Sequence, residues 1–92
     1  MYQILPYSFK RAKDLGVKII PSKHKNKKID VLDWYGNYIC SIGSIGYLDF
    51  PSYNFLYGSE YANNKRRLYK KRHDKDRKVE GSAGYYADQI LW

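Results

Sequence analysis

The positive charges of this chain fall in two segments on either side of a centre that has no lysine or arginine. Residues 10–28 contain eight basic residues and one acid, and residues 65–78 contain nine basic residues and two acids. Residues 29–64 contain four acids, no base and many aromatic residues. A folded core between two basic surfaces gives this pattern, because ordinary protein surfaces mix both signs of charge.

Length and composition limit the classes of protein to which the chain can belong. Its 92 residues suffice for one domain, so residues 1–92 are expected to form a single basic domain with a net charge of +8. No apolar run approaches the roughly 20 residues of a membrane span, and the N-terminus has no signal-peptide pattern. The lone Cys40 excludes an internal disulfide. We therefore expect a soluble protein that is not secreted and does not contact membranes.

Apolar alternation predicts the strands. Residues 17–20 read as a short strand, and residues 28–33 and 38–42 read as an antiparallel hairpin joined by a tight turn. Residues 43–58 are rich in glycine, serine and aromatic residues, and we expect an ordered loop there, with a short edge strand over residues 45–48 as an option.

Three helices are predicted from capping residues and apolar spacing. Ser8 is expected to cap a helix over residues 9–15, Ser59 a helix over residues 60–73, and Ser82 a terminal helix. The predicted fold class is α+β: a small antiparallel hairpin or three-stranded sheet packed by two C-terminal helices.

Residues suited to catalysis are few. Cys40 and His24 could form a nucleophile pair, but Cys40 is expected on an apolar strand face and His24 among lysines. Residues 73–76 (HDKD) could be part of a metal-dependent nuclease, yet the other acids are scattered singly. No GxxxxGK[ST] or GxGxxG motif is present. We expect a protein that is not an enzyme and has no metal, cofactor or small-molecule substrate.

The strongest functional signal is the run of cations in residues 65–73. On a helix these charges repel one another, and a phosphate backbone would relieve the repulsion and release counterions. A lysine-rich loop could hold a second stretch of backbone, and the interleaved tyrosine could stack on bases. Replacing Arg66, Arg67, Lys70 and Lys71 together is expected to abolish binding and leave the fold intact. The residues predicted to bind DNA or RNA are Lys23, Lys25, Lys27, Lys28, Lys65, Arg66, Arg67, Tyr69, Lys70, Lys71, Arg72 and His73.

The last third of the chain resembles a known family. Residues 66–73 (RRLYKKRH), residues 82–85 (SAGY) and the final Leu91-Trp92 resemble short basic proteins encoded by large DNA viruses and tailed phages. Residues 21–23 (PSK) and residues 27–31 (KKIDV) also resemble that family's lysine-rich entry into a β-hairpin. The resemblance implies a viral or phage setting, either in the host cell cytoplasm or in the virion, and it supplies no mechanism.

The same setting leaves a second function open. A minor virion structural protein, a capsid or tail accessory, would use the basic helix on acidic protein surfaces. Tyr85, Tyr86 and Trp92 would then be interface anchors, because aromatic residues dominate the centres of protein interfaces. The alternative for Trp92 is that it docks into the protein's own core.

Overall fold

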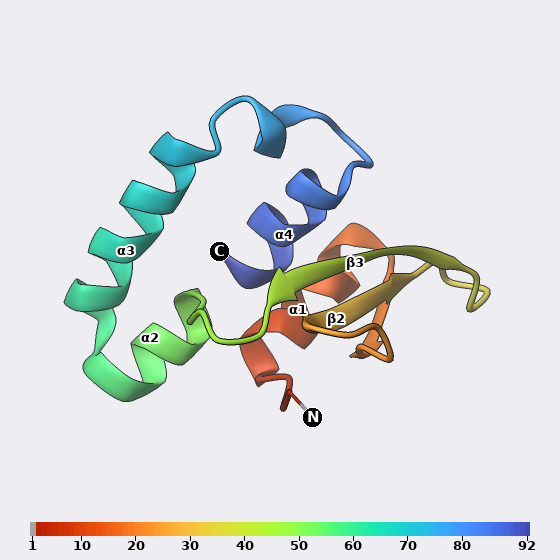
Figure 1. Ribbon diagram of the computed structural model, residues 1–92, viewed down its shortest axis with the longest axis horizontal. Helices are drawn as coiled ribbons and strands as arrows, with labels where there is room; N and C mark the ends of the chain where they lie inside the picture. Colours follow the sequence, from red (N-terminus) through yellow and green to blue (C-terminus); the bar gives the residue numbers. More distant parts are fainter. Residues whose placement is uncertain (1) are drawn as a thin grey trace.

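The computed structural model describes residues 2–92 and contains a three-stranded antiparallel sheet, which lies on the right in Figure 1. The strand order is β1-β2-β3, and helices precede and follow the sheet. The α+β prediction is therefore confirmed, in its three-stranded form. The elements in chain order are α1 (Pro6–Leu15), β1 (Lys18–Pro21), β2 (Lys27–Leu32), β3 (Tyr38–Ser44), α2 (Phe50–Tyr57), α3 (Ser59–Arg72), the 3-10 helix η1 (Asp76–Lys78) and α4 (Ala83–Leu91).

The hairpin between β2 and β3 forms where the alternation predicts it. Ile29 pairs with Ile42 and Val31 with Cys40 across the two strands. The three branched aliphatic side chains point into the core and are buried, because successive side chains of a strand alternate between the two faces of a sheet. The turn is held by Asp33, whose carboxylate accepts hydrogen bonds from the backbone N–H groups of residues 35 and 37.

Helices α1 and α4 pack on the apolar face of the sheet, and α1 starts earlier than predicted. The helix begins at Pro6, a residue favoured in the first helical turn because it has no N–H to satisfy. Ser8 is therefore inside the helix and not its cap; its buried hydroxyl donates to the carbonyl of Ile90 at 2.9 Å. The core cluster consists of Ile4, Ala12, Val17, Ile19, Ile29, Val31, Ile42, Ile90 and Leu91.

Helix α2 corrects the expectation of a loop over residues 43–58. Strand β3 continues to Ser44, no strand covers residues 45–48, and a helix follows from Phe50. The carboxylate of Asp49 caps this helix by accepting a hydrogen bond from the N–H of Ser52, and Pro51 occupies its first turn. The capping signal is present in the sequence, but the surrounding glycine, serine and aromatic residues hid it.

Helix α3 runs along one side of the molecule, at the left in Figure 1, and α2 packs against it. It begins at Ser59, so Gly58 takes the cap position that was predicted for Ser59. Helix α4 begins as predicted, with the hydroxyl of Ser82 accepting from the N–H of Tyr85. Among the described residues, no helix has the length and apolar character needed to cross a membrane.

Candidate nucleic-acid interface

The cations of α3 divide between two sides of the helix. Two of them face the body of the protein. The ammonium group of Lys70 donates to a carboxylate oxygen of Asp88 at 2.8 Å, and that carboxylate is 2% exposed. The guanidinium carbon of Arg66 lies 3.5 Å from the centre of the Phe50 ring, and one of its nitrogens donates to the Tyr7 hydroxyl. These two side chains hold α3 against the rest of the molecule.

Four other cations lie on the remaining surface of the helix. Arg67, Lys71 and Arg72 are exposed and Lys65 is half-buried, and none of them forms an ion pair within residues 2–92. Arg67 and Lys71 are four residues apart and Lys65 and Arg72 seven, so the two members of each pair point in nearly the same direction. At 3.6 residues per turn the two pairs lie about 130° apart around the helix, so together they cover a broad arc of its surface. We call these four residues the basic face.

Tyr69 and His73, which were predicted to contact nucleic acid, form an aromatic stack. The Tyr69 ring lies 4.2 Å from the Trp92 ring at an angle of 7°, and its other side stacks on His73 at 4.4 Å. Burial, with a smaller contribution from the charges of Asp88 and Asp76, raises the pKa of Tyr69 to about 12. Tyr69 therefore has no free ring face for a base.

The lysine-rich segment formed by the β1–β2 loop and the start of β2 offers three cations and not four: Lys23 and Lys25 in the loop, and Lys27 as the first residue of β2. Lys23, Lys25 and Lys27 are exposed and form no ion pair within the described part of the chain. Lys28 is buried, and its ammonium group lies 2.9 Å from a carboxylate oxygen of Asp49. In residues 2–92 no hydrogen bond, ion pair or ring contact joins the loop to α3, so the two segments are separate cationic surfaces.

Asp49 is the buried acid that retains Lys28. It also accepts a hydrogen bond from the Tyr2 hydroxyl at 2.6 Å and caps α2. Burial works against ionisation of this carboxyl group, but the bonds from Tyr2, Lys28 and Ser52 outweigh it, and the pKa of Asp49 falls below its usual range. The carboxylate is fully engaged inside the protein and leaves the cations of the basic face unpaired.

A polar cluster around Asp30 was not found by sequence reasoning. Asp30 accepts hydrogen bonds from the hydroxyls of Ser22 and Ser41, at 2.6 and 2.7 Å, and lies 3.1 Å from Nδ1 of His24. Burial opposes its ionisation, but these bonds and the Lys23 N–H hold the pKa of Asp30 at about 2.

The cluster brings together an acid, a histidine and a serine without forming a catalytic triad. In a triad the acid and the serine bond opposite nitrogens of the imidazole. Here Asp30 and the Ser41 hydroxyl both contact Nδ1 of His24, and Ser41 itself donates to Asp30. The arrangement fixes the lysine-rich loop onto the sheet.

The two enzymatic options raised by the sequence find no assembled site in the described residues. Burial, together with the charge of Asp30, raises the pKa of Cys40, which opposes formation of a thiolate. His73 lies 3.2 Å from Asp76, and Asp74 pairs with Arg77 and Lys78 at the end of α3. Within residues 2–92, no three His, Cys, Asp or Glu side chains are grouped in a way that could hold a metal ion.

The three predicted interface aromatics lie partly inside the protein. Tyr86 and Trp92 are half-buried against the core cluster, and Tyr85 contacts Tyr86 edge to face. The most exposed aromatics are others: Tyr35 at 90%, Phe55 at 79% and Tyr47 at 75%. The predicted turn between residues 33 and 38 already places Tyr35 outside the strands. Tyr47 and Phe55 stand in a glycine- and aromatic-rich segment without clear periodicity, so the sequence did not distinguish them from core residues.

Comparison with known proteins adds no assignment. No protein-family model matches the chain, and comparison with curated proteins and with solved structures finds no match.

Proposed function

We propose that this is a non-enzymatic nucleic-acid-associated protein of a virus or phage, which binds the phosphate backbone. The basic face of α3 is the main contact surface. Lys23 and Lys25 of the β1–β2 loop, with Lys27 at the start of β2, form a second one. The viral or phage setting rests on the resemblance of the last third of the chain to short basic proteins of such genomes.

One observation carries the proposal. The acids of this protein satisfy the inward cations Lys28 and Lys70 and leave the basic face without a carboxylate partner in residues 2–92. Four unpaired charges within eight residues of one helix repel one another, and a polyanion lowers that energy while its own condensed counterions are released. Proteins that read base sequence use single Asn, Gln or Arg side chains on an otherwise neutral surface, and the basic face has no side chain in such a setting. Contact with the phosphate backbone is therefore favoured over the reading of base sequence.

The salt dependence of binding tests the proposal. About four phosphate contacts by the basic face give log K against log salt a slope of about −3.5 on duplex DNA, and three more from the loop steepen it to about −6. The slope is measured by fluorescence anisotropy of a labelled oligonucleotide at salt concentrations from about 50 to about 300 mM. A flat response would contradict backbone binding.

A charge-matched pair of variants locates the surface. Arg67→Gln with Lys71→Gln removes two cations of the basic face and is expected to reduce the slope by about 2. Lys10→Gln with Lys13→Gln removes two exposed cations of α1, the same change in net charge, and is expected to leave the slope nearly unchanged. Arg66 and Lys70 are not suitable targets, since their side chains contact Phe50 and Asp88, and their replacement would change the stability of the fold together with binding.

A second candidate function is a minor virion structural protein. It is favoured by the exposed apolar residues Phe55, Leu56 and Tyr57 on α2, an arrangement that is uncommon on proteins without partners. Purification from infected cells separates the two functions. Nuclease-sensitive nucleic acid in the preparation supports the first, and a stoichiometric capsid or tail protein supports the second.

A further inference from the structure

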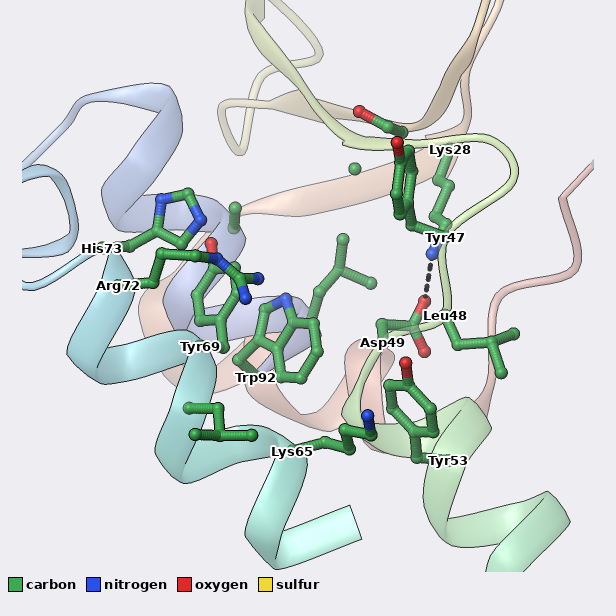
Figure 2. A pocket seen from close by; sticks show the side chains of 15 residues that line it. Lys28, Tyr47, Leu48, Asp49, Tyr53, Lys65, Tyr69, Arg72, His73 and Trp92 are labelled. Atoms are coloured by element: carbon green, nitrogen blue, oxygen red, sulfur yellow. Dashed lines mark hydrogen bonds and ion pairs between the residues drawn. The ribbon is translucent and has the colours of Figure 1, made fainter.

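An open cleft lies between α3 and the segment that joins β3 to α2. Its volume is about 570 Å³, within the range of pockets that hold small organic ligands. Helix α3 provides one wall, residues 43–49 and Tyr53 the other, and the end of α4 with Trp92 the base (Figure 2). The cleft shares Lys65 and Arg72 with the basic face, whereas Arg67 and Lys71 do not line it.

Aromatic rings dominate the centre of the cleft. Tyr69 covers one face of the Trp92 indole at 4.2 Å, so the opposite face is the one left for a ligand. Tyr53 lies 6.2 Å from Trp92 at an angle of 47°, and Tyr47 projects from the facing segment while being 75% exposed. Figure 2 shows the indole between Tyr69 on one side and Tyr53 on the other. A flat ring is the shape that continues such a stack.

The rim of the cleft is cationic. Lys65 and Arg72 both line it from α3, about 10 Å apart along the helix axis. The Lys65 ammonium group lies 5.7 Å from the centre of the Tyr53 ring. Asp49 is the one carboxylate among the described lining residues, and Lys28 and Tyr2 already occupy it. An anionic group at the rim therefore meets positive charge and no free acid.

We propose that this cleft binds one unpaired base of a single-stranded nucleic acid. The base stacks on the open face of Trp92, beside Tyr53 and Tyr47, while Lys65 and Arg72 contact the phosphates that flank it. Stacking on aromatic side chains accepts any base, because every base has a π face. Paired bases of a duplex have both faces covered by their neighbours, so the cleft selects single strands. The inference rests on the proposed function and adds the form of nucleic acid.

Two oligonucleotides of equal charge test the role of the base. A 12-nucleotide thymidine strand and an abasic phosphate–sugar chain of the same length present the same backbone, and only the first has rings to stack. We expect the thymidine strand to bind about 10- to 100-fold more tightly at equal salt. Equal affinities for the two chains would overturn the inference and leave the backbone proposal in place. Absence of binding to both, and to duplex DNA, would overturn the proposed function and the inference with it.

The fluorescence of Trp92 reports the contact directly. The chain has two tryptophans, and Trp34 lies in the β2–β3 turn, outside the residues that line the cleft, so Trp34→Phe leaves Trp92 as the only indole. Saturable quenching by the thymidine strand, with little change on adding duplex or the abasic chain, is expected. Binding of the thymidine strand with unchanged Trp92 emission would overturn the inference.

Tyrosine variants provide the matched control. Tyr47→Ala removes an exposed ring from the cleft and is expected to weaken thymidine binding several-fold with no effect on the abasic chain. Tyr35→Ala removes a ring that is 90% exposed at the hairpin turn, away from the cleft, and is expected to change neither affinity. Equal effects of the two variants would assign the loss to general surface chemistry and contradict the cleft.

Discussion

The two sides of α3 carry the same types of residue, but the cations on one side contact the rest of the protein and those on the other contact solvent. Lys70 reaches a buried acid and Arg66 reaches a phenyl ring, whereas Lys71 and Arg67, each one residue further along, reach solvent. A cation on this helix has a structural role if a group from a distant segment of the chain contacts it. A cation without such a contact is available to a binding partner. Asp88 lies 18 residues from Lys70 in the sequence, so local composition cannot distinguish the two kinds.

The two kinds of cation are also expected to contribute differently to the free energy of unfolding. Exposed ion pairs contribute about 0–1 kcal/mol, while breaking a buried pair costs about 3–5 kcal/mol because one charge is left without a partner in a low-dielectric site. Variants of inward cations and their acids should therefore change stability, and variants of the basic face should change binding.

The largest effect is expected at Asp49. Asp49→Ala leaves Lys28 buried and unpaired, removes the acceptor of the Tyr2 hydroxyl and removes the cap of α2. We expect the free energy of unfolding to fall by about 3–5 kcal/mol, measured by urea denaturation. Replacing the pair together, Lys28→Met with Asp49→Leu, should recover part of the loss. A single variant within about 0.5 kcal/mol of the wild type would show that this pair does not stabilise the fold.

Lys70→Gln is expected to have the next largest effect. Asp88 keeps its burial and loses its cation, while the partial exposure of Lys70 lets water compensate in part. We expect a loss of about 2 kcal/mol in the free energy of unfolding. The salt slope of nucleic-acid binding should stay as in the wild type under conditions where the variant is folded. A reduced slope with unchanged stability would reverse the assignment of this residue.

Local signals in the sequence predicted most of the fold. The alternation around Ile29 and Ile42 determined the hairpin, and Ser82 determined the start of α4, because each depends on neighbours within a few residues. Helix α2 was missed although Asp49 and Pro51 mark its start, since the composition of the surrounding residues favoured a loop.

The candidate site was predictable only as a collection of charges. The sequence showed that α3 is basic, but it could not show that Lys28 meets Asp49, or that Trp92 covers Tyr69. These contacts join segments far apart in the chain, and they decide which cations and rings remain for a ligand. The cleft exists only in the folded protein, since α3, α4 and the β3–α2 segment each provide part of it.

Low pH is expected to weaken the hydrogen bonds of Asp30, which hold the β1–β2 loop on the sheet. The folded pKa of Asp30 is about 2, below its ordinary value of 3.8, so ionised Asp30 stabilises the fold at higher pH. That contribution, at most about 2 kcal/mol, is lost as the pH falls from about 5 towards 2. Asp30→Asn should lower stability at pH 7 and make the curve of unfolding free energy against pH flatter over this range. Glu80→Gln, which removes an exposed acid, is the control; an equal flattening there would contradict the role of Asp30.

Lys71→Gln should have the smallest effect on stability and is the matched partner of Lys70→Gln. Its side chain is exposed and has no acid partner in residues 2–92, so the unfolding free energy should stay within about 0.5 kcal/mol of the wild type. The salt slope of binding should fall by about 1, as expected for one lost phosphate contact. Adjacent residues of one type would then separate stability from binding, because the direction of each side chain on α3, and not its charge, determines what it contacts. If Lys70→Gln and Lys71→Gln both changed stability and neither changed the salt slope, binding of a polyanion by the basic face would be contradicted.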